Sequence, residues 1–165
     1  MLLEAVIVVH IAAGLTAVIA GATAALAPKR PGAHPRGGRT YLLALLVLVA
    51  TATGIALARP HTAYLLVLGA LALAAAGTGF AARRRRWRGW PRHHITSMAI
   101  SYIAMLTGFY VDNGPRLPLW ELLPPISFWF LPAAVGVPLL VRALRRHPAR
   151  PASPDPGRAA EAVHD

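Results

Sequence analysis

Residues 62–92 read TAYLLVLGALALAAAGTGFAARRRRWRGWPR, an apolar run that ends abruptly in a cluster of arginines. The part from Thr62 to Ala82 carries no charge, and about 20 apolar residues are enough for a helix to cross a bilayer. An arginine at mid-membrane costs roughly 2.5–3.5 kcal/mol, so Arg83–Arg86 cannot lie in the hydrocarbon. We therefore predict a membrane-spanning helix at residues 62–82 that ends at the membrane surface.

Four other charge-free stretches of similar length flank this one, at residues 5–28, 40–58, 95–111 and 122–141. A soluble domain of 165 residues would not contain five helices that are apolar on every side. The sequence therefore predicts an all-α fold, a polytopic transmembrane helix bundle of five spans that occupies residues 1–146. Residues 147–165 are rich in Pro, Ala and Arg and predict a disordered cytoplasmic tail. No sequence repeat is evident.

The basic residues alternate between crowded and nearly empty connections. Of the 17 Lys and Arg residues, only Arg59 and Arg116 lie in the second and fourth connections, and the others lie in the first, the third and the tail. Because basic residues accumulate in cytoplasmic loops, we expect the N-terminus outside and the C-terminus in the cytoplasm. The richness in Ala, Arg, Gly and Pro suggests a bacterial genome, so we expect a multi-pass protein of the bacterial plasma membrane.

The formal net charge of +11 raises the question of a nucleic-acid partner. A nucleic-acid binder carries a basic face on a soluble fold, and no soluble fold remains here once the spans are removed. We therefore expect no nucleic-acid partner. The expected partners are the lipid bilayer and, at the cytoplasmic face, anionic lipid headgroups. The chain has no cysteine, which excludes disulfides and thiolate ligands.

Two histidines stand where the second and fourth spans begin, both on the predicted cytoplasmic side. A neutral imidazole is the form that ligates iron and other metals. Because His34 and His94 lie at one end of the bundle, they could reach the two faces of one haem b or the same metal ion. The candidate cofactor-binding residues are His34, His94, Arg39, Tyr41, Met98 and Tyr102. In the alternative interpretation, these polar groups only form hydrogen bonds between helices.

A third histidine, His10, lies inside the first span, roughly 10 Å below the outer surface. An ionisable group within a membrane is a functional-site hypothesis by default, and the alternative is a neutral histidine bonded to a neighbouring helix. With His61 and Asp112 it forms a second candidate site, for a metal ion on the outer side. Small residues share the face of His10, and we favour helix packing over a cofactor space as their role. They are Gly14, Ala17, Gly21 and Ala24.

The histidine motifs resemble a known family. The pattern His-x-x-x-Gly-Arg-x-Tyr begins at His34, and His-x-x-x-Met begins at His94, followed by Ser101 and Tyr102. Together with the early His10, these motifs resemble the bacterial membrane family known as domain of unknown function 2306, over residues 9–110. The resemblance implies a small polytopic membrane protein of uncharacterised activity.

Two functions stay open on the sequence alone. The first is a redox or electron-transfer component with a histidine-ligated haem b or metal ion. The second is a non-enzymatic membrane component whose polar residues are structural or contact lipid or a partner protein. The sequence has no phosphate-binding glycine loop, no Gly-x-Ser-x-Gly elbow and no His-Glu-x-x-His motif, so it does not identify an enzyme.

Overall fold

Every secondary-structure element in the described part of the chain is a helix. The computed structural model describes residues 1–28, 32–118 and 120–147. Its α-helices are α1 (Leu2–Leu26), α2 (Ala33–Ala58), α3 (Leu65–Arg84), α4 (Trp90–Asn113) and α5 (Ser127–Arg145). Each of the five is long and apolar enough to cross a membrane. The predicted fold class is confirmed, and the protein is a multi-pass membrane protein.

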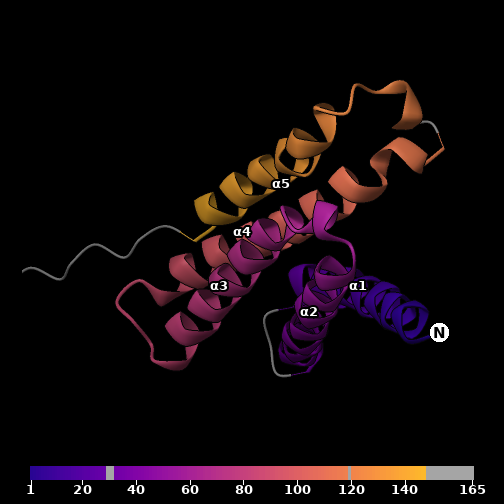
Figure 1. Ribbon diagram of the computed structural model, residues 1–165. Helices are drawn as coiled ribbons and strands as arrows, with labels where there is room; N and C mark the ends of the chain where they lie inside the picture. Colours follow the sequence, from indigo (N-terminus) through magenta and orange to yellow (C-terminus); the bar gives the residue numbers. More distant parts are fainter. Residues whose placement is uncertain (29–31, 119, 148–165) are drawn as a thin grey trace, which may run out of the picture.

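The helices form two hairpins and a fifth helix. α1 pairs with α2 and α3 pairs with α4, while α5 lies along α4 (Figure 1). Short connections make consecutive helices antiparallel, so α1, α3 and α5 end where α2 and α4 begin. We call this the arginine-rich end, because it carries Arg83–Arg86 and the arginines at 142–146, all exposed. The opposite end holds the 3-10 turns η1 (Pro60–Thr62), η2 (Gly114–Arg116) and η3 (Trp120–Leu122).

Three helices begin five or more residues away from the start of the predicted span. α2 begins at Ala33 rather than residue 40, and α4 at Trp90 rather than residue 95, because a helix can continue beyond the hydrocarbon where polar side chains reach water. α5 begins only at Ser127, after the Pro124-Pro125 pair, rather than at residue 122; proline supplies no backbone N–H for a helix interior. The predicted tail, apart from His147, lies outside the described residues.

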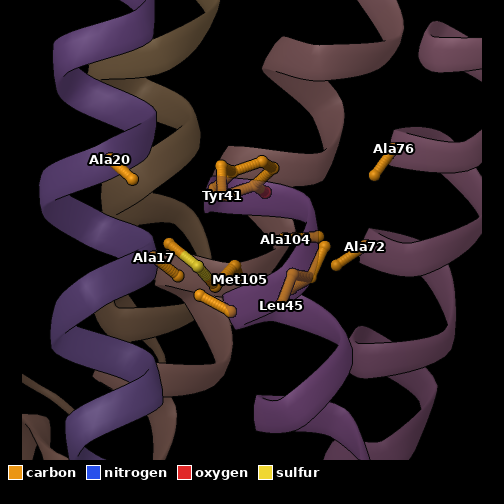
Figure 2. Close-up of a cluster of buried hydrophobic side chains, with 9 residues drawn as sticks. Ala17, Ala20, Tyr41, Leu45, Ala72, Ala76, Ala104 and Met105 are labelled. Atoms are coloured by element: carbon orange, nitrogen blue, oxygen red, sulfur yellow. The ribbon is translucent and has the colours of Figure 1, made fainter. Parts of the chain in front are cut away.

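Alanine dominates the core between the two hairpins. The largest buried side chain is Tyr41 of α2, only 1% exposed, and Leu45 lies one turn further along the same helix. Figure 2 shows Ala17 with Met105 on one side of this cluster and Leu45 with Ala72 on the other. Small residues allow helix backbones to approach closely, which is the main source of packing attraction in a bilayer.

The small residues predicted on one face of α1 serve this packing. A Cβ atom added to Gly14 would lie 3.4 Å from Leu48 of α2, and one added to Gly21 would lie 2.5 Å from the ring of Tyr102 of α4. Ala17 is fully buried. Other helices therefore occupy the space beside this face, and the packing interpretation is confirmed.

Candidate functional site

Both helices that carry the candidate ligands begin after a glycine with positive φ. Gly32 precedes α2 with φ 128°, and Gly89 precedes α4 with φ 70°. Residues with a side chain rarely adopt this backbone conformation, whereas glycine adopts it readily. Pro91 then fits the first turn of α4, where its missing N–H has no helical partner to lose. These starts place His34 and His94 within the first turns of their helices.

The imidazole of His34 is anchored on the end of α1. Its Nδ1 lies 2.8 Å from the carbonyl oxygen of Ala24, and because a carbonyl only accepts, Nδ1 carries the proton. The helical partner of this carbonyl would be the N–H of residue 28, which is a proline and has none. The histidine therefore donates a hydrogen bond to a carbonyl at the end of α1, and this bond joins α2 to α1.

His94 repeats this arrangement in the second hairpin. Its Nδ1 lies 2.9 Å from the carbonyl oxygen of Gly79 in α3, so this ring is also protonated on Nδ1. Met98 fills the space that a side chain on Gly79 would occupy: its Sδ lies 3.1 Å from the position of a Cβ on that glycine. His94 and Met98, predicted to share one face of α4, therefore both contact α3.

The two imidazole rings lie next to each other across the hairpins. Their centroids are 6.2 Å apart and their planes are nearly perpendicular, at 83°. With the proton on Nδ1, the nitrogen that bears the lone pair in each ring is Nε2. Histidines that bind metals typically donate their other N–H to a backbone carbonyl in this way. The structure thus places the rings of His34 and His94 side by side, each with its proton on Nδ1.

Two tyrosines further inside the bundle each form a hydrogen bond to another helix. The hydroxyl of Tyr41 lies 2.7 Å from Oγ of Ser101, and both side chains are almost completely buried. Tyr102 donates from its hydroxyl to the carbonyl oxygen of Val18, at 2.9 Å, and the two tyrosine rings are 6.0 Å apart. These predicted cofactor residues lie about two helical turns from the histidines, roughly 10 Å along the helices, and they bond to neighbouring helices.

His10 is held by α2. Its Nδ1 lies 3.1 Å from the carbonyl oxygen of Leu48 and 3.0 Å from Oγ1 of Thr51. Thr51 in turn donates to its own helix, to the carbonyl oxygens of Val47 and Leu48. This is the arrangement expected of a neutral histidine that bonds a neighbouring helix.

The remaining predicted residues are spread over the surface. Arg39 is exposed on α2, His61 is exposed in η1, and Asp112 is exposed near the end of α4. Throughout residues 1–28, 32–118 and 120–147, no three side chains of His, Cys, Asp or Glu gather closely enough to hold a metal ion. His10, His61 and Asp112 therefore do not form a three-ligand cluster.

Two residues that position the candidate site were not among the predicted site residues. Gly79 provides both the carbonyl for His94 and the space for Met98, and Ser101 bonds Tyr41. A backbone carbonyl leaves no trace in a sequence. The available signals were a glycine near the end of an apolar helix and, for Ser101, its place in the motif that begins at His94.

The protein belongs by its fold to the multi-pass helical membrane proteins, and its site is a pair of histidines at one end of the bundle. No family model, curated protein or solved structure matches the chain.

Proposed function

We propose that the protein binds a metal ion, or the iron of haem b, between His34 and His94, and that it serves as an electron-transfer component of the membrane. The observation that carries this proposal is the pair of neighbouring rings, each fixed by a backbone carbonyl in the tautomer that leaves Nε2 as the ligand atom. The resemblance to the family of domain 2306 stays part of the proposal, because it rests on the same two histidine motifs.

The spacing of the rings supports a shared ligand. Histidine nitrogens bind metals at ~2.0–2.1 Å, so two imidazoles on opposite sides of one metal have ring centres about 6 Å apart. The observed 6.2 Å agrees with this value. An edge-to-face contact between two aromatic rings has a similar spacing of about 4.5–7 Å, so a spectrum is needed to distinguish the two.

The first experiment records the visible spectrum and the metal content of the protein purified in detergent from haem-replete cells. We expect a Soret band or one bound metal equivalent, lost in His34→Ala and in His94→Ala. His10→Ala is the matched control. This histidine is also half-buried and bonded to a carbonyl, but it lies toward the end of the bundle opposite the histidine pair. A protein without absorbance and without metal would end the ligand proposal.

We also propose that the arginine-rich end faces the cytoplasm of a bacterial plasma membrane and contacts anionic headgroups. The basic residues of this end are exposed at Arg36, Arg39 and Arg83–Arg86, among others, and each basic residue near an anionic surface contributes about 1 kcal/mol. Positive charge is retained on the cytoplasmic side during insertion.

Reporter fusions test this orientation. A fluorescent protein fused after Arg92 should fluoresce, and alkaline phosphatase fused there should be inactive, because both report the cytoplasmic side. Fusions after Arg116, at the opposite end, should give the reverse pattern. Active phosphatase after Arg92 would contradict the orientation and place the histidine pair on the outer side.

A second candidate function has one specific observation in its favour. His10, His34 and His94 all donate to a backbone carbonyl of the neighbouring helix in their own hairpin, as expected if they serve only to join helices in a non-enzymatic membrane component. In that case the three alanine variants should each lower the melting temperature while no variant, and no parent protein, shows bound haem or metal.

A further inference from the structure

Three buried positions of α2 recur in α4, each 60 residues further on in the sequence. Two others do not recur: buried Thr107 corresponds to exposed Val47, and buried Ala56 corresponds to exposed Arg116 of η2. The pairs are Tyr41 with Ser101, Ala44 with Ala104 and Leu45 with Met105, all buried. The two histidines, His34 and His94, are separated by the same 60 residues. The two helices thus present the same face to the bundle in the same register.

The first helix of each hairpin shows the same correspondence. Three buried positions of α1 recur in α3, each 59 residues further on, and the change by one residue falls in the connection to the next helix. The pairs are Ala13 with Ala72, Ala17 with Ala76 and Ala20 with Gly79, all buried. The recurrence therefore covers both helices of each hairpin.

Contacts inside the two hairpins recur as well. A Cβ added to Gly37 of α2 would lie 3.1 Å from the backbone oxygen of Ala20. In the second hairpin, Cβ of Ser97 lies 3.2 Å from the position of a Cβ on Gly79. Ser97 is the counterpart of Gly37, and Gly79 is the counterpart of Ala20. The two helices of each hairpin are therefore packed in the same register.

Two of the contacts between the hairpins join residues to their own counterparts. Tyr41 bonds Ser101, and the ring of His34 lies against that of His94. In a two-fold arrangement, residues that touch their own equivalents lie on the symmetry axis. The two contacts are seven residues apart on each helix, roughly 10 Å at 1.5 Å per residue, so they define a line between α2 and α4.

We infer that the two hairpins are repeats of one unit, related by a pseudo-two-fold axis along the bundle, and that the ligand of the histidine pair is held on this axis with one Nε2 from each repeat. The placement of the ligand rests on the proposed function, whereas the repeat does not. Both hairpins enter the bundle in the same direction, as in parallel membrane repeats whose axis follows the membrane normal. The ligand then bridges the two repeats.

Several features depart from the symmetry. Tyr102 donates to the carbonyl of Val18, whereas its counterpart in the first hairpin is Leu42, which has no hydroxyl. His34 bonds Ala24, one helical turn beyond Ala20, the residue that corresponds to Gly79. In addition, α5 lies along α4, and no helix among the described residues occupies the matching place beside α2 (Figure 1). The bond of His34 departs from the symmetry at a ring that lies on the axis. α5 lies away from the axis and extends the second repeat without entering the contact between the hairpins.

The repeat is tested by exchanging the two side chains that meet on the axis. Tyr41→Ser removes the ring from the core, and Ser101→Tyr adds a second ring beside the first. Each should lower the melting temperature in detergent by about 5 °C or more. In the double variant the ring stands on α4 and the serine on α2, so we expect it to recover more than half of the summed loss. A double variant as unstable as that sum would overturn the repeat.

A second measurement covers the case in which Ser101→Tyr does not fold. Because the chain has no cysteine, His34→Cys with His94→Cys introduces only two thiols, which a short bifunctional thiol reagent should join within one molecule in native membranes. The control is His10→Cys with His94→Cys, with thiols at opposite ends of the bundle. Equal joining in the two pairs would overturn the axis contact.

The position of the ligand is tested separately with added haem b and with added Zn²⁺. We expect one of these to raise the melting temperature of the unaltered protein, and His34→Ala and His94→Ala to abolish the rise equally. A rise that depends on only one histidine would place the ligand off the axis and overturn this part of the inference. If neither probe has an effect but the exchange succeeds, the repeat stands and the proposed function fails.

Discussion

Replacing Gly21 with leucine is expected to lower the melting temperature by about 10 °C. A Cβ at this position would lie 2.5 Å from Cε2 of Tyr102 and 3.1 Å from Cδ2 of Tyr41. Neither ring can move easily, because Tyr102 is tied to the carbonyl of Val18 and Tyr41 to Ser101. Overpacking costs about 1–3 kcal/mol and sometimes more, and 1 kcal/mol corresponds to about 2–4 °C for a chain of this size.

The matched control is Gly77→Leu on α3. A Cβ at Gly77 would have nothing within 4 Å, so the added side chain should point into lipid. Both variants replace a helical glycine with leucine and gain the same helix propensity, nearly 1 kcal/mol. Thermal unfolding in one detergent, followed by circular dichroism, compares them. An equal loss in both variants would mean that α1 does not pack against Tyr102.

The spans could be predicted because hydrocarbon imposes a simple rule. The run at residues 62–82 and the arginines after it specify a helix and its end almost by composition alone. The helix boundaries at the other surfaces were less predictable. Hydropathy locates the apolar part of a helix, whereas α2 and α4 continue through polar residues to the glycines with positive φ.

The candidate site could be predicted only in part. That His34 and His94 lie at one end of the bundle follows from the alternating direction of the spans. That their rings touch, and that each is anchored by Nδ1, depends on the carbonyls of Ala24 and Gly79. Their positions are set by helix rotation, which a nearly uniform apolar sequence does not specify.

The repeat is hidden from the sequence for a related reason. Packing between helices selects the size of a residue more than its identity, so Ala20 and Gly79 count as equivalent although they differ. The two contacts on the axis differ in this respect: His34 meets an identical residue, His94, whereas Tyr41 meets Ser101 in the buried core. Two tyrosines at positions 41 and 101 would overlap and two serines would leave a void, whereas one tyrosine with one serine fills the space. A single chain, unlike a symmetric dimer, can hold different residues at the two positions.

Because the ring of Tyr41 fills this space, we expect its removal to lower the stability of the protein strongly. Tyr41→Ala should lower the stability by about 3 kcal/mol, the lower end of the range for deletion of a large core aromatic. The lower end is expected because lipid is as apolar as the core, so the lost stability comes from packing more than from transfer out of water. The ring is 1% exposed among α1, α3 and α4 (Figure 2), and no neighbouring alanine is large enough to fill the cavity.

Two variants define the origin of this loss. Leu43→Ala, on the same helix but with a side chain that is 66% exposed, should change the melting temperature little, because only lipid contacts are lost. Tyr41→Phe keeps the ring and removes the hydroxyl bonded to Ser101, which should cost about 0.6–1.7 kcal/mol. If Tyr41→Phe is as unstable as Tyr41→Ala, the hydrogen bond rather than the packed ring holds the two hairpins together. If Leu43→Ala is as unstable as Tyr41→Ala, α2 is rotated and its exposed face lies in the core.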